Sequence, residues 1–291
     1  SYDLTKKVKT KNSRIIKGIK EIVFPSELII GTFAISKEYI FSIVFNKFNF
    51  DFIHIQHPDP ISALCVIFYK ILKPNIKIVV SWHADIYKGY KLISPILFLI
   101  DFFLYLISSQ LIFFTPNHLR NSFISKFYFL NKKTKIIHNC IEIKNFNFYK
   151  FNKRNSIKNK KKINLLSIGR LVKYKGYEYA IKALKNANKN IHYVIIGNGP
   201  LKLSLLELIH RLDLTKRVQI IGEVTERKKY KLLAEADIFL FPSITTSEAY
   251  GLVQLEAMAH NIPIINTSLK NGVNYLAPNN IAITCKTKNI D

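Results

Sequence analysis

The sequence predicts an α/β protein made of two Rossmann-like domains whose parallel sheets face a cleft. Short β-branched runs alternate with amphipathic stretches along most of the chain, and a basic segment of low complexity separates two such series. The chain has 291 residues, enough for two domains, and its 48% hydrophobic and 22% charged residues are typical of a folded protein. We expect a first domain over 1–145, a linker over 146–162 and a second domain over 163–291.

The first domain shows the alternation less regularly than the second. Its expected strands are 50–58, 77–85, 110–116 and 133–139, and its expected helices are 61–72 and 93–107. The linker is rich in Lys and Asn and has no apolar periodicity.

The second domain alternates regularly. The run INLLSIG is typical of a strand, and the run YEYAIKALKNA then places its apolar residues at helical spacing. The expected strands are 163–169, 192–197, 218–222, 237–243 and 262–268, and the expected helices are 177–187, 201–212, 226–236 and 251–259. Such βαβ units predict a parallel sheet with ligands at the carboxyl ends of its strands.

The apolar stretch from Leu92 to Ile107 allows three interpretations. It contains Asp101, and Pro95 stands where a helix would start. A membrane-spanning helix needs about 20 apolar residues, so a buried or interface-facing helix is favoured over a span. The aromatic content also fits a helix that lies on a membrane surface.

The chain is strongly basic, with 44 Lys and Arg against 19 Asp and Glu and a formal net charge of +25. Residues 1–161 hold 26 basic and 9 acidic residues, whereas residues 162–291 hold 18 and 10. This excess favours a nucleic acid, a phosphate ester or an anionic membrane surface as partner, although compositional drift toward Lys would also raise the total. Because no stacking-aromatic or basic-helix motif is present, we expect no nucleic acid.

The three cysteines, Cys65, Cys140 and Cys285, show neither disulfide nor metal-ligand spacing, which indicates a reducing compartment. No secretory signal is visible near Ser1. We therefore expect a cytoplasmic protein, bound peripherally to the cytoplasmic face of the membrane through its basic first half.

Basic residues follow the first strand of the second domain. In SIGRLVKYKG, Gly169 makes the turn after the strand, and Arg170 and Lys175 come before a helix. The planar fork of an arginine and the mobile charge of a lysine together suit a diphosphate; the alternative is two solvated surface cations. After the next strand, Gly197 either lets the backbone approach a ligand or makes a tight turn.

The segment SEAYGLVQLEAM places Glu248 before, and Glu256 within, a helix expected to begin at Gly251. Free N–H groups of Gly251, Leu252 and Val253 would form an anion site at the helix N-terminus. Carboxylates accept hydrogen bonds from hydroxyls, so each glutamate could hold one sugar. The alternatives are a helix cap for Glu248 and an ordinary exposed residue for Glu256.

In the first domain, His83 ends the strand-like run VVSWH and could donate a hydrogen bond or accept a proton, or could be structural. The chain contains no Asp-x-Asp pair, Walker loop, GxGxxG, zinc spacing or GxSxG. We therefore expect a metal-free diphosphate site with no cofactor.

With these residues in view, the chain resembles the family 4 glycosyltransferases, which are retaining enzymes with the two-domain GT-B fold. The resemblance rests on GRLVKYKG, IIGNGP and SEAYGLVQLEAMAHNIPIINTS, which looks like the E-x7-E region of that family, and it is strongest from about 163 to 275. It implies a nucleotide-diphosphate sugar in the second domain, with Arg170 and Lys175 on the diphosphate. It further implies Glu256 on the ribose, Glu248 on the donor sugar and the amides of 251–253 on the distal phosphate.

The resemblance also implies transfer of a hexose to a lipid-linked or polysaccharide acceptor in surface glycan assembly, with His83 near the reacting centre. The first strand of that family and its C-terminal helix have no counterpart here, and Ala249 and Asn261 stand where Gly is common; we expect a fragment lacking both extreme termini. The competing predictions are a non-catalytic nucleotide-sugar-binding relic, a GT-B epimerase or phosphorylase, and a basic nucleic-acid-binding module.

Overall fold

The computed structural model describes residues 11–30, 33–45, 50–85, 93–126, 133–142, 161–246, 248, 250–269, 272–278 and 281–290. The chain divides into two compact units, each with its own parallel sheet. The first unit comprises Ser1–Phe113 and Ser122–Ile137, and the second comprises Phe114–Asn121 and His138–Asp291. The expected linker, apart from residues 161 and 162, lies outside the described residues, and the expected domain boundaries stay predictions.

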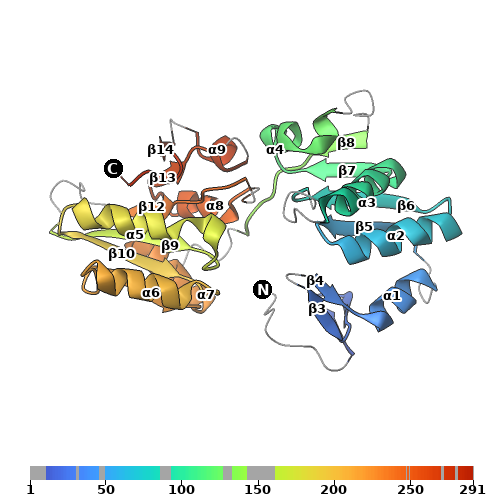
Figure 1. Cartoon of the computed structure of the whole chain (residues 1–291), viewed down its shortest axis with the longest axis horizontal. Helices are drawn as coiled ribbons and strands as arrows, with labels where there is room; N and C mark the ends of the chain where they lie inside the picture. The colour runs from blue at the N-terminus through green and yellow to red at the C-terminus, as the bar shows by residue number, and fades with distance from the viewer. Residues whose placement is uncertain are drawn as a thin grey trace. The chain divides into compact units, whose positions relative to one another are not determined.

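The sheet of the first unit has the order β5-β6-β7-β8, with all neighbours parallel (Figure 1). Its strands are Phe52–His57, Lys77–Trp82, Gln110–Phe113 and Thr134–Ile136. Helix α2 (Pro60–Leu72) connects β5 to β6, and α3 (Ser94–Ile107) lies between β6 and β7 in the chain. The carboxylate of Asp59 accepts from the N–H of Ile61 and so caps α2.

The apolar stretch around Asp101 forms α3. Asp101 is fully buried, and its Oδ1 lies 2.8 Å from Nε2 of the equally buried His57. Within the described ranges, no helix combines the length and the apolarity needed to cross a membrane.

One aromatic residue organises the interior of this unit. The Trp82 side chain is fully buried at the carboxyl end of β6. The centre of its ring lies 4.3 Å from that of His57 and 6.3 Å from that of Phe113. Its indole N–H donates to the Asp85 carboxylate over 2.9 Å. Because a buried indole N–H needs an acceptor, this bond fixes the ring.

Two hairpins and a helix that the sequence patterns do not predict precede this sheet. Strand β1 (Asn12–Ile16) pairs antiparallel with β2 (Ile19–Val23), β3 (Leu28–Ile30) pairs antiparallel with β4 (Phe33–Ile35), and α1 (Lys37–Val44) follows. These strands are three to five residues long, and β1 is exposed along its whole length. They therefore lack the buried apolar run that marks a core strand.

The sheet of the second unit has the order β11-β10-β9-β12-β13-β14, again all parallel. Its strands are β9 (Ile163–Ile168), β10 (Ile191–Ile196), β11 (Val218–Gly222), β12 (Ile238–Phe241), β13 (Ile264–Thr267) and β14 (Ala282–Cys285). Its helices are α4 (Pro116–Asn121), α5 (Tyr177–Asn186), α6 (Lys202–Arg211), α7 (Glu226–Glu235), α8 (Leu252–Ala259) and α9 (Gly272–Leu276). The chain winds outward from β9 in one direction and from β12 in the other, so these central neighbours form the topological switch point where such sheets bind ligands.

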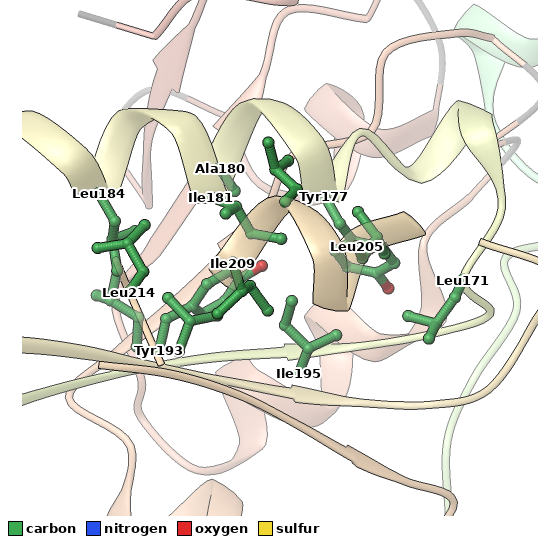
Figure 2. Packing of buried hydrophobic residues seen from close by; sticks show 13 residues of the cluster. Leu171, Tyr177, Ala180, Ile181, Leu184, Tyr193, Ile195, Leu205, Ile209 and Leu214 are labelled. Carbon is green, nitrogen blue, oxygen red and sulfur yellow. The ribbon is translucent and has the colours of Figure 1, made fainter. Parts of the chain in front are cut away.

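Helices cover both faces of this sheet. Successive strand residues point to opposite faces, so Leu165 joins one apolar cluster and Leu166 another. Figure 2 shows the first cluster, in which α5 and α6 pack onto the sheet. Its members on these helices and on β10 include Tyr177, Ile181, Leu184, Leu205, Ile209, Tyr193 and Ile195. The expected elements of this unit are present; α4, α9 and β14 are additional.

Candidate active site

The loops that follow β9 and β12 meet at the switch point of the second unit. The backbone N–H of Ile244 donates to the carbonyl oxygen of Tyr174 over 2.8 Å. At Gly176, where φ is 67°, an added Cβ would lie 2.1 Å from the carbonyl oxygen of Pro242. Only glycine allows this approach, so the two loops form one continuous rim at the carboxyl ends of the strands.

A buried ion pair crosses this junction. The Lys175 ammonium contacts Oε2 of Glu248, and the two side chains are only 11% and 12% exposed. Oε2 of Glu248 also accepts from the Ser243 hydroxyl, over 3.4 Å. Lys175 is therefore not a solvated surface cation: its charge is held in place by a carboxylate on the opposite loop.

The ring of Phe241, the last residue of β12, links this pair to the start of α8. The Lys175 Nζ lies 5.1 Å from the centre of the ring, and a Cβ on Gly251 would lie 3.1 Å from its edge. One aromatic ring thus touches both the lysine and the residue that precedes α8.

Helix α8 begins as the sequence predicts. Gly251 is its N-cap, with φ 78° and ψ 52°, and among the described residues no side chain caps the first turn. The neighbouring Tyr250 is buried and donates its hydroxyl to the carbonyl oxygen of Asn139 over 3.0 Å, which anchors the loop. The N–H groups of Leu252 and Val253 belong to this uncapped first turn, where the helix dipole favours an anion.

The glycines Gly169 and Gly197 bring the loops after β9 and β10 into backbone contact. A Cβ on Gly197 would lie 2.0 Å from the carbonyl oxygen of Gly169, and a Cβ on Gly169 would lie 3.3 Å from the Lys175 Nζ. Both have positive φ, 145° for Gly197 and 154° for Gly169. Their contribution to a donor site stays a prediction.

Arg170, in the loop after β9, is exposed. Burial raises the pKa of Tyr174, with Glu248 adding to the rise and Arg170 opposing it. Both charged groups therefore lie close enough to this phenol for their fields to act on it.

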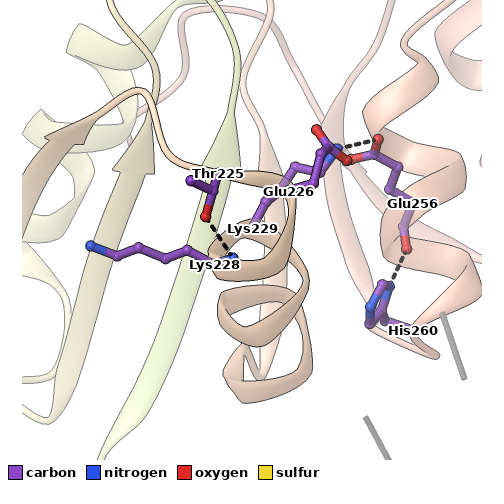
Figure 3. A network of polar contacts seen from close by, with 6 residues as sticks. All are labelled: Thr225, Glu226, Lys228, Lys229, Glu256 and His260. Atoms are coloured by element: carbon purple, nitrogen blue, oxygen red, sulfur yellow. Dashed lines mark hydrogen bonds and ion pairs between the residues drawn. The ribbon is translucent and has the colours of Figure 1, made fainter. Parts of the chain in front are cut away.

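Glu256 lies in the middle of α8 and pairs across to α7. Oε1 accepts from the Lys229 ammonium over 2.9 Å, and Lys229 also contacts Glu226 at 3.0 Å (Figure 3). Oε2 is buried and has no hydrogen-bond partner among the described residues. Burial alone would lower the pKa of Lys229, but hydrogen bonds to Glu256 and Glu226 raise it overall. The lysine therefore remains charged at neutral pH.

Lys229 was not among the sequence candidates. It lies in the run 226–231, which contains four cations, and a single sequence gives no signal that separates it from its neighbours. Figure 3 shows the adjacent Lys228 pointing away from Glu256. In the structure, the Lys229 ammonium reaches the Glu256 carboxylate on α8.

His83 belongs to the first unit, whereas the other candidates belong to the second. Its N–H donates to the carbonyl oxygen of His57 over 2.8 Å, and its Nε2 lies 2.8 Å from the Gln56 side-chain oxygen. Burial, with a further effect of His57, lowers its pKa. A neutral imidazole at a strand end can accept a proton, and its place near the reacting centre stays a prediction.

The assembled groups of the second unit are cations, a pair of carboxylates and an uncapped helix N-terminus. Such a set can bind a diphosphate and hydroxyl groups. Within the described residues, no three His, Cys, Asp or Glu side chains are grouped closely enough to hold a metal ion.

Residues 148–291 match the family described as Glycosyl transferases group 1. An uncharacterised glycosyltransferase of Methanocaldococcus jannaschii is 28% identical over 268 residues, which cover 88% of this chain and 63% of that protein. The O-antigen biosynthesis glycosyltransferase WclY of Escherichia coli is 29% identical over 236 residues, covering 76% of this chain and 62% of that protein. The chain thus spans less than two thirds of either relative.

The solved structure of Anabaena HepE in complex with UDP and glucose is similar with a TM-score of 0.69 and 17% identity, over 92% of this chain and 73% of that one. Sucrose-phosphate synthase of Thermosynechococcus elongatus is similar with a TM-score of 0.68 and 15% identity, over 92% and 71%. These likenesses show that the fold is GT-B, as the sequence predicts.

Proposed function

We propose that the chain is a glycosyltransferase that transfers a sugar from a nucleotide-diphosphate donor. Its match to the group 1 family over residues 148–291 and its similarity to glycosyltransferases support this proposal. The observation that carries this proposal is the Lys175–Glu248 pair, which joins the loops after β9 and β12 at the topological switch point. Doubly wound sheets bind nucleotides in this position.

Each group in the site has a role in this proposal. Arg170 and Lys175 hold the diphosphate together with the amides at the start of α8, and Glu248 holds the donor sugar. Glu256 takes the ribose, because its buried Oε2 is an acceptor that still lacks a donor among the described residues.

In the proposed reaction the bond between the anomeric carbon and the diphosphate oxygen breaks. The acceptor hydroxyl oxygen bonds to the same carbon from the same face, and its proton passes to the leaving diphosphate. Arg170 and Lys175 stabilise the charge that develops on that oxygen. The transfer is therefore retaining and needs no metal, in keeping with the resemblance to family 4.

The names of two relatives support a more specific proposal for the acceptor. WclY is named for O-antigen biosynthesis, and a Campylobacter jejuni relative, 31% identical over 153 residues, is named as a transferase acting on a diphospho-undecaprenol acceptor. We propose a hexose as the transferred sugar and a lipid-linked or polysaccharide acceptor in surface glycan assembly. The protein would then act in the cytoplasm, peripherally on the cytoplasmic face of the membrane.

The first test is binding and turnover with UDP-, GDP- and ADP-sugars. We expect one donor class to raise the melting temperature, and we expect Glu248→Gln to lower sugar transfer at least about 100-fold, since removing one preorganised polar contact costs that much. The exposed Glu207→Gln on α6 is the matched control.

Because Glu248→Gln leaves the buried Lys175 without its partner, stability is measured separately. The double variant Lys175→Met, Glu248→Gln removes both charges and keeps the fold testable by circular dichroism. A folded Glu248→Gln variant with normal turnover would contradict the assignment. Donor binding without transfer by the wild type would favour a nucleotide-sugar-binding relic.

A further inference from the structure

The first unit presents an apolar face on adjacent helices. Helix α1 packs against α2, and α2 packs against α3 on one face of the sheet (Figure 1). The outward residues recur at helical spacing and are between 42% and 69% exposed: Leu64, Phe68, Ile71 and Leu72 on α2, and Ile96, Leu99, Phe103 and Leu106 on α3. Phe41 of α1 is exposed in the same way. We call this surface the α2–α3 face.

These helices are apolar on both sides. Facing the sheet, α2 buries Val66 and Tyr69, and α3 buries Leu97 and Leu104. A water-exposed helix normally carries polar residues on its outer side. An isolated exposed leucine needs no explanation, but two adjacent stripes of them mark a contact surface.

The charges in and around the face are distributed unevenly. The charged residues within α2 and α3 are Lys70, which donates to the carbonyl oxygen of Ile76, and the buried Asp101. Lysines lie at the helix ends: Lys73 follows α2, and the Lys133 ammonium donates to the carbonyl oxygens of Tyr105 and Leu106, over 3.2 and 2.9 Å, at the end of α3. The face is thus an apolar area whose rim is basic at the carboxyl ends of both helices; at the amino end of α2, the carboxylate of Asp59 is bound to the first turn as its cap.

We propose that the α2–α3 face lies on an anionic lipid bilayer, with its apolar side chains among the acyl chains and its rim lysines at the phosphates. Charge complementarity selects this occupant. A second copy of the chain would bring two basic rims together, whereas an anionic bilayer offers hydrocarbon to the face and negative charge to the rim. Long lysine side chains can reach the headgroups while their stems stay in apolar surroundings.

The inference rests on the part of the proposed function that puts the acceptor in a membrane, and it names the surface that holds the protein at that membrane. Net charge alone predicts only that the basic first half contacts the membrane, whereas the structure assigns this contact to helices α2 and α3. Attachment is then monotopic, because these helices lie along the bilayer rather than through it.

The test measures binding to vesicles of phosphatidylcholine mixed with phosphatidylglycerol by co-flotation. The variant Ile71→Gln, Phe103→Gln should bind at least about tenfold more weakly, because two exposed apolar side chains no longer enter the hydrocarbon. The matched control is Leu203→Gln, Ile283→Gln, whose side chains are 74% and 68% exposed but lie in the second unit. It should bind like the wild type.

Three results would overturn the inference. The first is that the face variant and the control variant bind vesicles equally well. The second is that salt abolishes vesicle binding while the substitutions in the face do not change it. The third is that the wild type self-associates and the face variant is monomeric in sedimentation. Circular dichroism checks that both variants fold. Nucleotide-sugar binding, measured without vesicles, separates failure of this inference from failure of the proposed function.

Discussion

At the scale of single residues, the closest backbone approach in the site requires a glycine. Gly197 brings its loop against the carbonyl oxygen of Gly169, and both loops border the rim that holds Lys175. A methyl group at position 197 would have no space without moving backbone, and its φ of 145° is a conformation that L-residues avoid.

We therefore predict that Gly197→Ala lowers the free energy of unfolding by on the order of 3 kcal/mol, the combined effect of backbone strain and overpacking. Gly222→Ala is the matched control, because Gly222 also has positive φ but has no described atom within 4 Å of the place that a Cβ would take. Its cost should be about 1 kcal/mol, from backbone conformation alone. Urea denaturation followed by circular dichroism measures both, and equal costs would show that the close approach is unimportant.

The sequence predicts the types of residue in the site but not their partners. Lys175 and Glu248 are both candidates from local patterns, yet they lie 73 positions apart, and only the pairing of β9 with β12 brings them into contact. Ion pairs of this kind depend on sheet order, which periodicity does not encode. The Lys229–Glu256 pair depends in turn on how α7 and α8 pack, which local patterns do not encode either.

At the scale of elements, the α7–α8 contact positions Glu256. Lys229 on α7 contacts one carboxylate oxygen and leaves the other with no partner among the described residues. In the proposed function this orients the carboxylate toward the ribose. In that proposal the pair would serve nucleotide binding rather than the chemical step.

Replacing Lys229 with Met should weaken nucleotide binding about tenfold, since hydrogen bonds to charged groups contribute roughly 1.5–3 kcal/mol and this one is partly solvated. Lys228→Met is the matched control on the same turn, because that side chain points away from Glu256. Isothermal titration with the preferred nucleotide measures the difference. If both variants bind like the wild type, Lys229 does not position the carboxylate.

The elements that sequence patterns predict are those with a buried face. Strands β9 to β13 carry apolar runs because helices cover both faces of the sheet, and helices α5 to α8 each bury one face against it. The strands of the hairpins β1–β2 and β3–β4 have three to five residues, β1 is exposed along its whole length, and α9 has five residues. Elements of this size are set by contacts with the rest of the unit, so no local pattern predicts them.

At the scale of the whole molecule, the chain has two units with separate sheets and separate interiors. The sequence predicts two Rossmann-like domains because each series of βαβ repeats is recognisable independently, and the resemblance to family 4 then implies the GT-B fold. The boundary is harder to predict, because α4 belongs by its contacts to the unit that follows it, although its sequence lies between two strands of the first.

We expect calorimetry to show two unfolding transitions, since each unit has its own core. A nucleotide that binds the second unit should raise one transition and leave the other in place. At 100 times its dissociation constant, it would add about 2.7 kcal/mol to the stability of that unit alone. A single transition that moves as a whole would show that the units unfold together.

Trp82 makes the intrinsic fluorescence of the chain a probe of one unit. It is the single tryptophan of the sequence, and it is fully buried in the first unit with its indole N–H bound to Asp85. Its emission therefore reports the solvation of that unit and of no other part of the chain. The red shift of this one fluorophore would identify which half of the protein has opened at any temperature or denaturant concentration.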